Sequence, residues 1–206
     1  MKPDSGMLRD TNVSRETLAD LATYVELLKS WNEKINLVSP DTISEIWERH
    51  ISDCLQLFNL APRNAKHCVD LGTGGGLPGL VLAIAAKRFD GLRFSMVDSD
   101  SRKMVFVSNV VRVLGLHAEA VHGRIDDLPS MNADVVTARA LAPLSKLLSF
   151  AERHRNSEGI CLFLKGENAD KELTAASDDW HMDVEKIKSA TNPNACILKI
   201  GRFSRV

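Results

Sequence analysis

The 206-residue sequence has no apolar run approaching the roughly 18 residues that a membrane-spanning helix needs. Residues 1–11 are polar and lack the apolar segment of a secretion signal. These absences argue against an integral membrane protein and against an exported one. We therefore expect a soluble, cytoplasmic protein with no membrane partner. The length gives room for one full domain with a modest extension.

The sequence also lacks a C-x-x-C pair, because its four cysteines are widely scattered. Three of them sit within apolar runs, which is typical of reduced thiols in a protein core. We expect neither a disulfide framework nor a metal site. The four cysteines are Cys54, Cys68, Cys161 and Cys196.

A basic excess is missing as well. The chain has 26 Lys and Arg residues against 27 Asp and Glu residues, for a formal net charge of −1. A surface that follows a phosphate backbone normally shows as net positive charge. Any nucleic-acid site must therefore be a local basic patch.

Residues 1–65 are predicted to form an all-helical N-terminal extension. Within Leu18–Ile35, apolar residues recur at three- and four-residue steps, the spacing of one face of an amphipathic helix. A second helix is predicted over Ile43–Phe58, with Ser39 able to cap it and Pro40 suited to the first helical position.

Residues 66–206 are predicted to form an α/β domain. Short apolar runs alternate there with helical stretches, which indicates parallel strand–helix–strand units. Gly115 is expected to end one helix, and the short polar loop around 192–194 predicts that the last two strands pair antiparallel. The predicted fold is thus a doubly wound, mostly parallel, seven-stranded sheet. The predicted strands are 68–71, 94–97, 118–122, 133–137, 160–164, 184–187 and 196–200.

A glycine-rich loop within Val69–Gly79 joins the first strand to the helix that follows. Glycines there let the backbone turn tightly and approach a ligand closely. Gly74, Gly76 and Gly79 formally satisfy G-x-G-x-x-G, so an NAD-dependent oxidoreductase must be considered. Asp70 argues against it, because a carboxylate just before the glycines would repel a pyrophosphate.

A carboxylate at this position suits a cationic ligand without phosphate. S-adenosylmethionine carries a sulfonium and an ammonium group, and Asp70–Gly74 resembles the adenosylmethionine loop of Rossmann-like methyltransferases. Asp98, at the end of the second strand, is placed to accept hydrogen bonds from ribose hydroxyls. Asp126 could accept from an adenine amino group while the Ile125 amide meets a ring nitrogen. A plain surface turn explains that last spacing nearly as well.

The segment Thr137–Pro143, after the fourth strand, is informative through what it lacks. It has neither the Asp/Asn-Pro-Pro-aromatic motif of enzymes that methylate exocyclic amines nor the cysteine nucleophile of carbon-directed pyrimidine enzymes. Guanine N7 fits this gap, because its lone pair is free at neutral pH and no general base is needed. Arg139 would then steer the base, a phosphate or the cofactor carboxylate, with a structural salt bridge as the alternative. Lys165, ending the fifth strand, invites a similar interpretation.

Five segments of the chain match the motifs of one family: Trp31–Leu37, Arg49–Asp53, Val69–Gly79, Ala138–Ala140 and Leu164–Gly166. Together they resemble the ribosomal small subunit methyltransferase G family, once called glucose-inhibited division protein B. The resemblance implies a Rossmann-like class I methyltransferase fold with S-adenosylmethionine as methyl donor. It also implies formation of 7-methylguanosine at guanine 527 of 16S ribosomal RNA.

The patterns and the resemblance give a predicted site. Arg139, His50 and Arg49 are the candidates for acting on the substrate at the point of methyl transfer. The predicted cofactor contacts cluster on the loops that follow the first four strands. They are Asp70, Gly72, Gly74, Leu77, Asp98, Ile125, Asp126 and Arg139.

The expected partner is 16S ribosomal RNA, naked or in a small-subunit particle, and the protein is expected to be a monomer. The predicted RNA contacts are basic residues from several segments. They are Lys34, Arg49, Arg102, Lys103 and Lys165. The alternatives are a methyltransferase for another RNA, a small molecule or a protein, an NAD-dependent oxidoreductase, and a non-catalytic RNA protein that binds adenosylmethionine.

Overall fold

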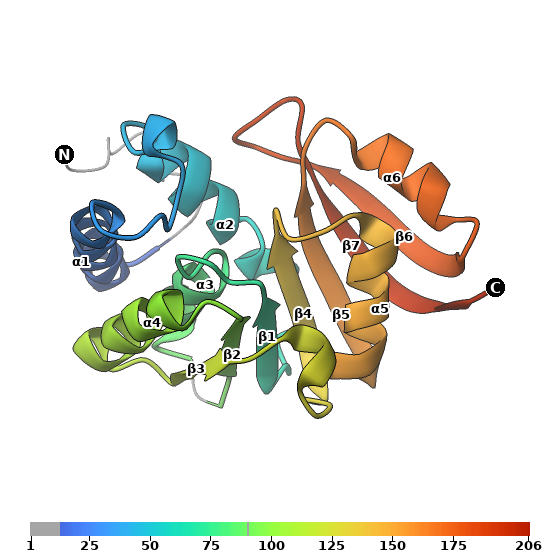
Figure 1. Ribbon diagram of the computed structural model, residues 1–206, viewed down its shortest axis with the longest axis horizontal. Helices are drawn as coiled ribbons and strands as arrows, with labels where there is room; N and C mark the ends of the chain where they lie inside the picture. Colours follow the sequence, from blue (N-terminus) through green and yellow to red (C-terminus); the bar gives the residue numbers. More distant parts are fainter. Residues whose placement is uncertain (1–12, 90) are drawn as a thin grey trace.

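A seven-stranded sheet forms the centre of the computed structural model, which describes residues 13–89 and 91–206 (Figure 1). The strand order is β3-β2-β1-β4-β5-β7-β6. Neighbours from β3 to β5 are parallel, whereas β7 is antiparallel to both β5 and β6. The predicted mostly parallel sheet and its antiparallel last pair are therefore confirmed. The strands are β1 (His67–Leu71), β2 (Arg93–Asp98), β3 (Ala118–His122), β4 (Ala133–Arg139), β5 (Arg155–Lys165), β6 (Trp180–Lys188) and β7 (Cys196–Arg205).

Helices cover both faces of this sheet, because successive strand residues point to opposite sides. Phe94 and Met96 of β2 join the apolar cluster under α1 to α4, whereas Val97 joins the cluster under α5 and α6. Figure 1 shows these two groups of helices on either side of the central strands. The α-helices are α1 (Arg15–Asn32), α2 (Asp53–Leu55), α3 (Gly79–Ala86), α4 (Ser101–Leu114), α5 (Leu144–His154) and α6 (Ala169–Ala176).

The strand order reverses between β1 and β4. The chain runs outward from β1 through β2 to β3, and then returns to place β4 on the other side of β1. Loops leaving the carboxyl ends of β1 and β4 therefore diverge, which opens a crevice at the usual ligand position of such sheets.

Helix ends follow the expected local chemistry. The Ser14 hydroxyl caps α1 by accepting from the Thr17 amide, and Asp100 caps α4 by accepting from the Arg102 amide. Gly115 adopts a left-handed conformation with φ of 59° and ends α4, as predicted.

The predicted second helix is present in part, but it is not a regular α-helix. The chain forms a 3-10 turn over Pro40–Thr42, a π-helical segment over Trp47–Ser52, then α2, and a 3-10 turn over Phe58–Leu60. Pro40 does occupy the first position of its turn, but the Ser39 side chain makes no capping bond. The π-helical segment coincides with a tertiary contact, because its Arg49 carbonyl accepts from an arginine of β4.

The N-terminal helices pack into the same apolar cluster as α3 and α4. Leu21 and Tyr24 of α1 are fully buried there, together with Cys54 of α2. The predicted extension therefore shares the core of the α/β domain. Residues 1–12, including the predicted polar N-terminus, lie outside the described residues. Within the described ranges, no helix combines the length and apolar character needed to cross a bilayer.

Candidate functional site

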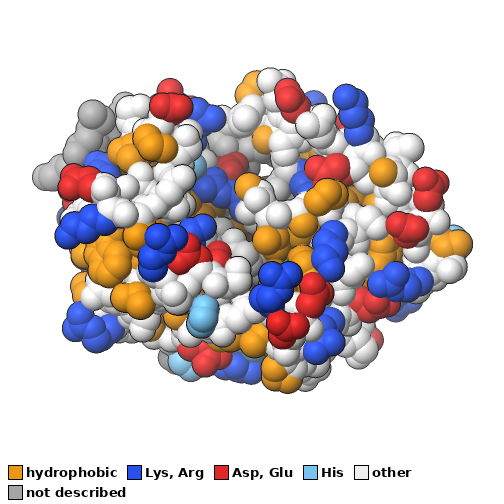
Figure 2. Space-filling model, viewed as in Figure 1, with side chains coloured by type: hydrophobic (Ala, Val, Ile, Leu, Met, Phe, Trp, Pro, Cys, Tyr) orange, Lys and Arg blue, Asp and Glu red, His pale blue; other side chains and the backbone are white. Residues whose placement is uncertain are grey.

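Two adjoining cavities lie at the carboxyl ends of β1 and β4. The glycine-loop cavity, about 550 Å³, is bounded by the loop after β1, and the neighbouring cavity, about 1110 Å³, extends toward the loop that joins β6 to β7. Figure 2 shows the surface hollowed between the N-terminal helical part and the strands beside it. Five residues line both cavities and mark their junction: Thr42, His50, Arg139, Ala140 and Leu141.

The glycine loop needs glycine for reasons that the structure makes specific. Gly72, Gly74 and Gly76 all have positive φ, at 64°, 56° and 90°. A Cβ on Gly72 would lie 2.4 Å from Leu141 Cδ1, and one on Gly76 would lie 2.2 Å from Leu80 Cδ1. A Cβ on Gly74 would meet only one atom at 4.0 Å. Gly74 therefore presents bare backbone to the cavity.

The structure corrects the predicted direct role of Asp70. Its side chain is fully buried, where it accepts from the Gly79 amide at 2.9 Å and from the Thr137 hydroxyl at 2.8 Å. Burial raises the pKa of this carboxyl to about 6. Asp70 is absent from the cavity lining, so it holds the glycine loop against α3 and β4 from behind. Gly79 is required for the same reason, because a Cβ there would lie 2.8 Å from Asp70 Oδ2.

The other predicted cofactor positions are brought together. Asp98 accepts from the Gly74 amide and from the Asp100 amide, both at 2.9 Å, which fixes its carboxylate at the cavity. Asp126 also reaches the cavity and pairs with Lys146 at 3.3 Å. The predicted residues that line the glycine-loop cavity are Gly72, Gly74, Leu77, Asp98, Ile125, Asp126 and Arg139.

One wall of the glycine-loop cavity comes from the N-terminal segment, which the sequence reasoning missed. Residues 37–39 line the cavity, and the Asn32 side chain holds them by accepting from the Leu37 and Val38 amides at 2.8 and 2.9 Å. Tyr24 of α1 donates its hydroxyl to the Gly75 carbonyl at 2.7 Å. The available signal was the motif Trp31–Leu37, in which Asn32 accepts these two backbone hydrogen bonds.

The junction of the two cavities is held by Arg139, at the end of β4. Its guanidinium donates to the Arg49 carbonyl at 3.1 Å and to His50 Nδ1 at 2.7 Å. Since Nδ1 accepts, the proton lies on Nε2, which donates to the Thr42 hydroxyl at 2.8 Å. The next residue, Ala140, has φ of 52°, a strained conformation for a residue with a side chain.

Asp53 is another residue that the predicted site did not include. Its Oδ1 accepts from the Thr191 hydroxyl at 2.9 Å, and its Oδ2 lies 3.7 Å from Arg139 Nη1. Gln56 reinforces this link by accepting from the Ala190 amide at 2.7 Å. The N-terminal segment is thereby tied both to β4 and to the β6–β7 loop. Asp53 closes the Arg49–Asp53 motif, which was the only signal for it.

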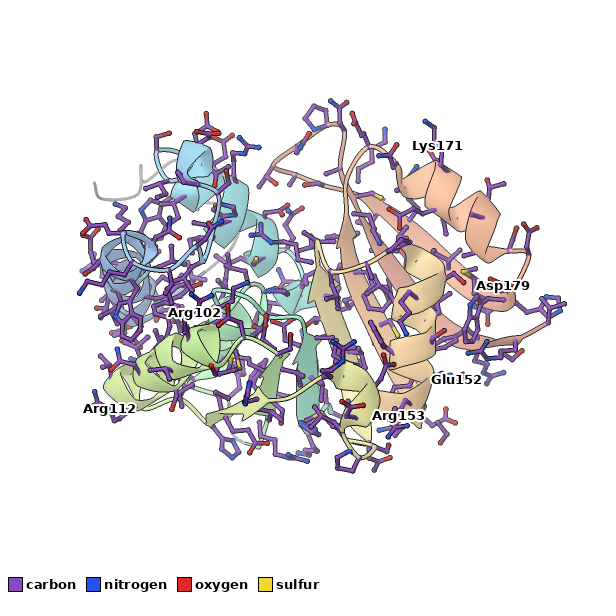
Figure 3. All side chains as sticks on the ribbon, in the orientation of Figure 1. Arg102, Arg112, Glu152, Arg153, Lys171 and Asp179 are labelled. Carbon is purple, nitrogen blue, oxygen red and sulfur yellow. The ribbon has the colours of Figure 1, made fainter. Side chains whose placement is uncertain are left out.

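The structure places the predicted RNA contacts in different surroundings. Lys34 and Arg102 are exposed, and Figure 3 shows Arg102 at the end of α4 where the helix begins. Lys103 lines the glycine-loop cavity, and Arg49 is exposed on the neighbouring cavity in an ion pair with Glu45.

Lys165 requires a correction. Its ammonium is 2.7 Å from Glu172, donates to the Ala142 carbonyl, and belongs to a side chain only 8% exposed. Lys165 therefore forms a buried ion pair with Glu172 in the cavity wall and does not present its charge to RNA.

Residues 13–89 and 91–206 contain no group of three His, Cys, Asp or Glu side chains arranged to hold a metal ion. All four cysteines are buried free thiols, and burial raises the pKa of Cys54 to about 12.

The fold resembles that of known methyltransferases. An O-methyltransferase from Bacillus cereus, solved in complex with SAH, superposes with a TM-score of 0.62 at 12% identity, covering 95% of each chain. A SAM-dependent methyltransferase from Aquifex aeolicus gives 0.59 at 14% identity, covering 85% of this chain and 97% of that one. These likenesses show a class I methyltransferase fold.

Sequence relatives narrow the assignment. Ribosomal RNA small subunit methyltransferase G of Gluconobacter oxydans is 46% identical, over 95% of this chain and 99% of its own. The protein of the same name from Ruegeria pomeroyi is 42% identical over 100% of both chains. The profile of the family described as rRNA small subunit methyltransferase G matches residues 17–197. With the family profile and full-length relatives in agreement, this chain belongs to the rRNA small subunit methyltransferase G family.

Proposed function

We propose that this protein transfers a methyl group from S-adenosylmethionine to N7 of a guanine, guanine 527, in 16S ribosomal RNA. Family membership makes the chain an S-adenosylmethionine-dependent rRNA methyltransferase and sets aside the oxidoreductase alternative. The acceptor atom, the position in the RNA and the residue roles are the proposal. The observation that carries it is that none of the five residues lining both cavities is available as a general base.

His50 is the only side chain among the five junction residues that could take up a proton near neutral pH. Burial, together with the nearby Arg139 and Arg49, lowers the pKa of His50 to about 4. Both ring nitrogens are already engaged, since Nδ1 accepts from Arg139 and Nε2 donates to Thr42. His50 is therefore a neutral structural link.

Guanine N7 matches such a junction, because its lone pair takes the methyl group without losing a proton. An exocyclic amine or a ribose hydroxyl would need a base to remove one. The contribution of the protein is then to hold the acceptor and the methyl donor in line. Arg139 lines both cavities and is suited to that positioning role.

The glycine-loop cavity suits S-adenosylmethionine in size and chemistry. Its volume of about 550 Å³ is in the range of small-molecule sites. Asp98 would hold the ribose hydroxyls, and Asp126 with the Ile125 amide would hold the adenine. The bare backbone at Gly72 and Gly74 would approach the amino-acid part. The buried Asp70 supports this loop from behind.

The neighbouring cavity would receive the guanine, and basic side chains would bind the RNA strands. Lys34, Arg49, Arg102 and Lys103 are the proposed contacts. A substrate of this kind would place the protein in the cytoplasm, acting as a monomer on free RNA or on a small-subunit particle.

Mapping modified guanines in small-subunit RNA tests this function directly. RNA from cells with and without the protein should differ in one 7-methylguanosine, and the purified protein with S-adenosylmethionine should restore it. Borohydride and aniline cleavage followed by primer extension would locate the position. Methylation at another atom or in another RNA would contradict the proposal.

The rate of methyl transfer should show no titration near pH 6–7, the range in which an unperturbed histidine ionises. The lowered pKa of His50 keeps this ring neutral through that range. Single-turnover rates between about pH 5.5 and 8.5 provide the measurement, with His50→Ala as the comparison. A rise in the parent that His50→Ala removes, while RNA still binds, would instead identify His50 as a base.

A further inference from the structure

The Arg139–Asp53 pair faces the neighbouring cavity with a donor and an acceptor side by side. Arg139 Nη1 lies 3.7 Å from Asp53 Oδ2, and the two side chains are only 18% and 16% exposed. Both residues line the neighbouring cavity, and Arg139 also lines the glycine-loop cavity. The pair therefore lies where a nucleobase would have to enter the neighbouring cavity to approach the methyl donor.

The two oxygens of Asp53 are used unequally. Oδ1 accepts from Gln56 Nε2 at 3.2 Å, from the Ser189 hydroxyl at 3.4 Å and from the Thr191 hydroxyl at 2.9 Å. Among residues 13–89 and 91–206, Oδ2 contacts only Arg139, at a distance longer than a hydrogen bond. A largely buried carboxylate with one oxygen lacking a hydrogen-bond donor gains from a ligand that brings an N–H group.

Arg139 also retains donors. Among the described residues it makes two hydrogen bonds, to the Arg49 carbonyl and to His50 Nδ1. A guanidinium has five N–H groups, so three make no hydrogen bond with these residues, and Nη1 also faces Asp53. Those three lie on a side chain whose direction is already set by its two existing bonds.

We infer that Arg139 and Asp53 read the guanine base: Arg139 donates to O6, and Asp53 Oδ2 accepts from N1–H. On guanine, N7, O6 and N1–H follow one another around the rim of the base. If N7 points toward the glycine-loop cavity, O6 and N1–H therefore point toward the Arg139–Asp53 pair. Adenine has a donor in place of O6 and an acceptor at N1. It would set donor against donor and acceptor against acceptor.

This inference rests on the proposed N7 acceptor and adds how that base is selected. A polar pair that is buried by the correct base but left unmatched by another base rejects the second strongly. The other carboxylates on the cavity have protein partners or lie exposed: Glu172 pairs with Lys165 and Glu45 with Arg49, while Glu48 is exposed.

The test uses small-subunit RNA carrying guanine, inosine or 2-aminopurine at the mapped position, as free RNA or particle, whichever the protein methylates. Inosine keeps O6, N1–H and N7, so its kcat/KM should stay within about threefold of guanine. 2-Aminopurine keeps N7 but lacks O6 and N1–H, so its kcat/KM should fall roughly 10- to 100-fold. Equal rates for guanine and 2-aminopurine, or inosine as poor as 2-aminopurine, would overturn the inference.

The variant Asp53→Asn tests whether Asp53 contacts the base, because a purely structural role would leave the preference for guanine over 2-aminopurine unchanged. Its amide can turn to donate to N1 of 2-aminopurine, so the guanine to 2-aminopurine ratio of kcat/KM should shrink at least about tenfold. The double variant Ser189→Ala, Thr191→Val removes loop contacts but leaves the carboxylate. It should slow both substrates equally and keep the ratio.

Asp20→Asn is the matched control, since it breaks a half-buried Asp–Lys ion pair of 2.9 Å remote from both cavities. Its ratio should equal that of the parent. An unchanged ratio in Asp53→Asn, with circular dichroism and adenosylmethionine affinity like the parent, would overturn the reading role. Failure of the parent to form 7-methylguanosine on ordinary RNA would instead refute the proposed function.

Discussion

Arg139→Ala should lower kcat/KM for RNA methylation roughly 100-fold, because a small misplacement of reacting groups costs about that much. The arginine ties β4 to the N-terminal wall through the Arg49 carbonyl and His50 Nδ1. It also carries the donors proposed for guanine O6. Losing Arg139 removes one of the causes that lower the pKa of His50, but neither residue exchanges a proton in the proposed reaction. The pH dependence of the rate should therefore follow that of the parent. Steady-state and single-turnover assays across pH provide the measurement.

Arg155→Ala is the matched control for this loss. Arg155 also holds backbone, since its Nη1 donates to the carbonyls of Asn156, Ser157 and Gly159, but it lines neither cavity. Methylation per folded molecule should therefore stay within about twofold of the parent. Arg139→Lys should recover only part of the activity, because an ammonium cannot reproduce the planar fork of donors. Parent-like activity in Arg139→Ala would remove this residue from the site.

Gly74→Ala should weaken S-adenosylmethionine binding about tenfold or more. Its φ of 56° is unfavourable for alanine by about 1–2 kcal/mol, but no neighbouring atom blocks the new Cβ. Gly74 lines the glycine-loop cavity, and its amide donates to Asp98. The methyl group would therefore stand where the ligand approaches the backbone. Isothermal titration calorimetry gives the affinity.

Gly115→Ala separates the conformational cost from the effect on the ligand. Gly115 has φ of 59°, a Cβ added there would meet nothing within 4 Å, and the residue ends α4 away from both cavities. Both variants should lose a similar free energy of unfolding in urea, while only Gly74→Ala should lose affinity. Equal affinity losses would show that the effect is on folding, and no loss in Gly74→Ala would place the ligand elsewhere.

Most of the fold could be predicted from the sequence, because strands and helices there are specified by local patterns. Alternating apolar runs and helical stretches gave the seven strands, and Gly115 marked a helix end through its left-handed backbone. The prediction of a regular helix over Ile43–Phe58 holds only in part, because a π-helical segment runs directly into α2 and 3-10 turns flank the two. The irregularity coincides with a contact that no local pattern predicts, because the Arg49 carbonyl accepts from Arg139 of β4.

The candidate site divides in the same way. The loop residues Gly72, Gly74 and Asp98 could be placed because they end strands whose order follows from the pattern, and all carboxyl ends of parallel strands meet at one edge. Asp70 and Lys165 lie at the ends of their strands as predicted, but their side chains face internal partners and not a ligand. Whether a charge faces solvent or an internal partner depends on neighbours such as Thr137 and Glu172.

Only the tertiary structure showed which contacts attach the N-terminal segment to the rest of the site. Tyr24 reaches Gly75 across 51 positions, Arg139 reaches His50 across 89, and Asp53 reaches Thr191 across 138. Periodicity and turn chemistry describe neighbours a few positions apart, so they carry no information about such pairs. These contacts depend on the packing of α1 and α2 against α3, which itself lies on the sheet. That packing positions the polar groups at the junction where we propose that the guanine is methylated.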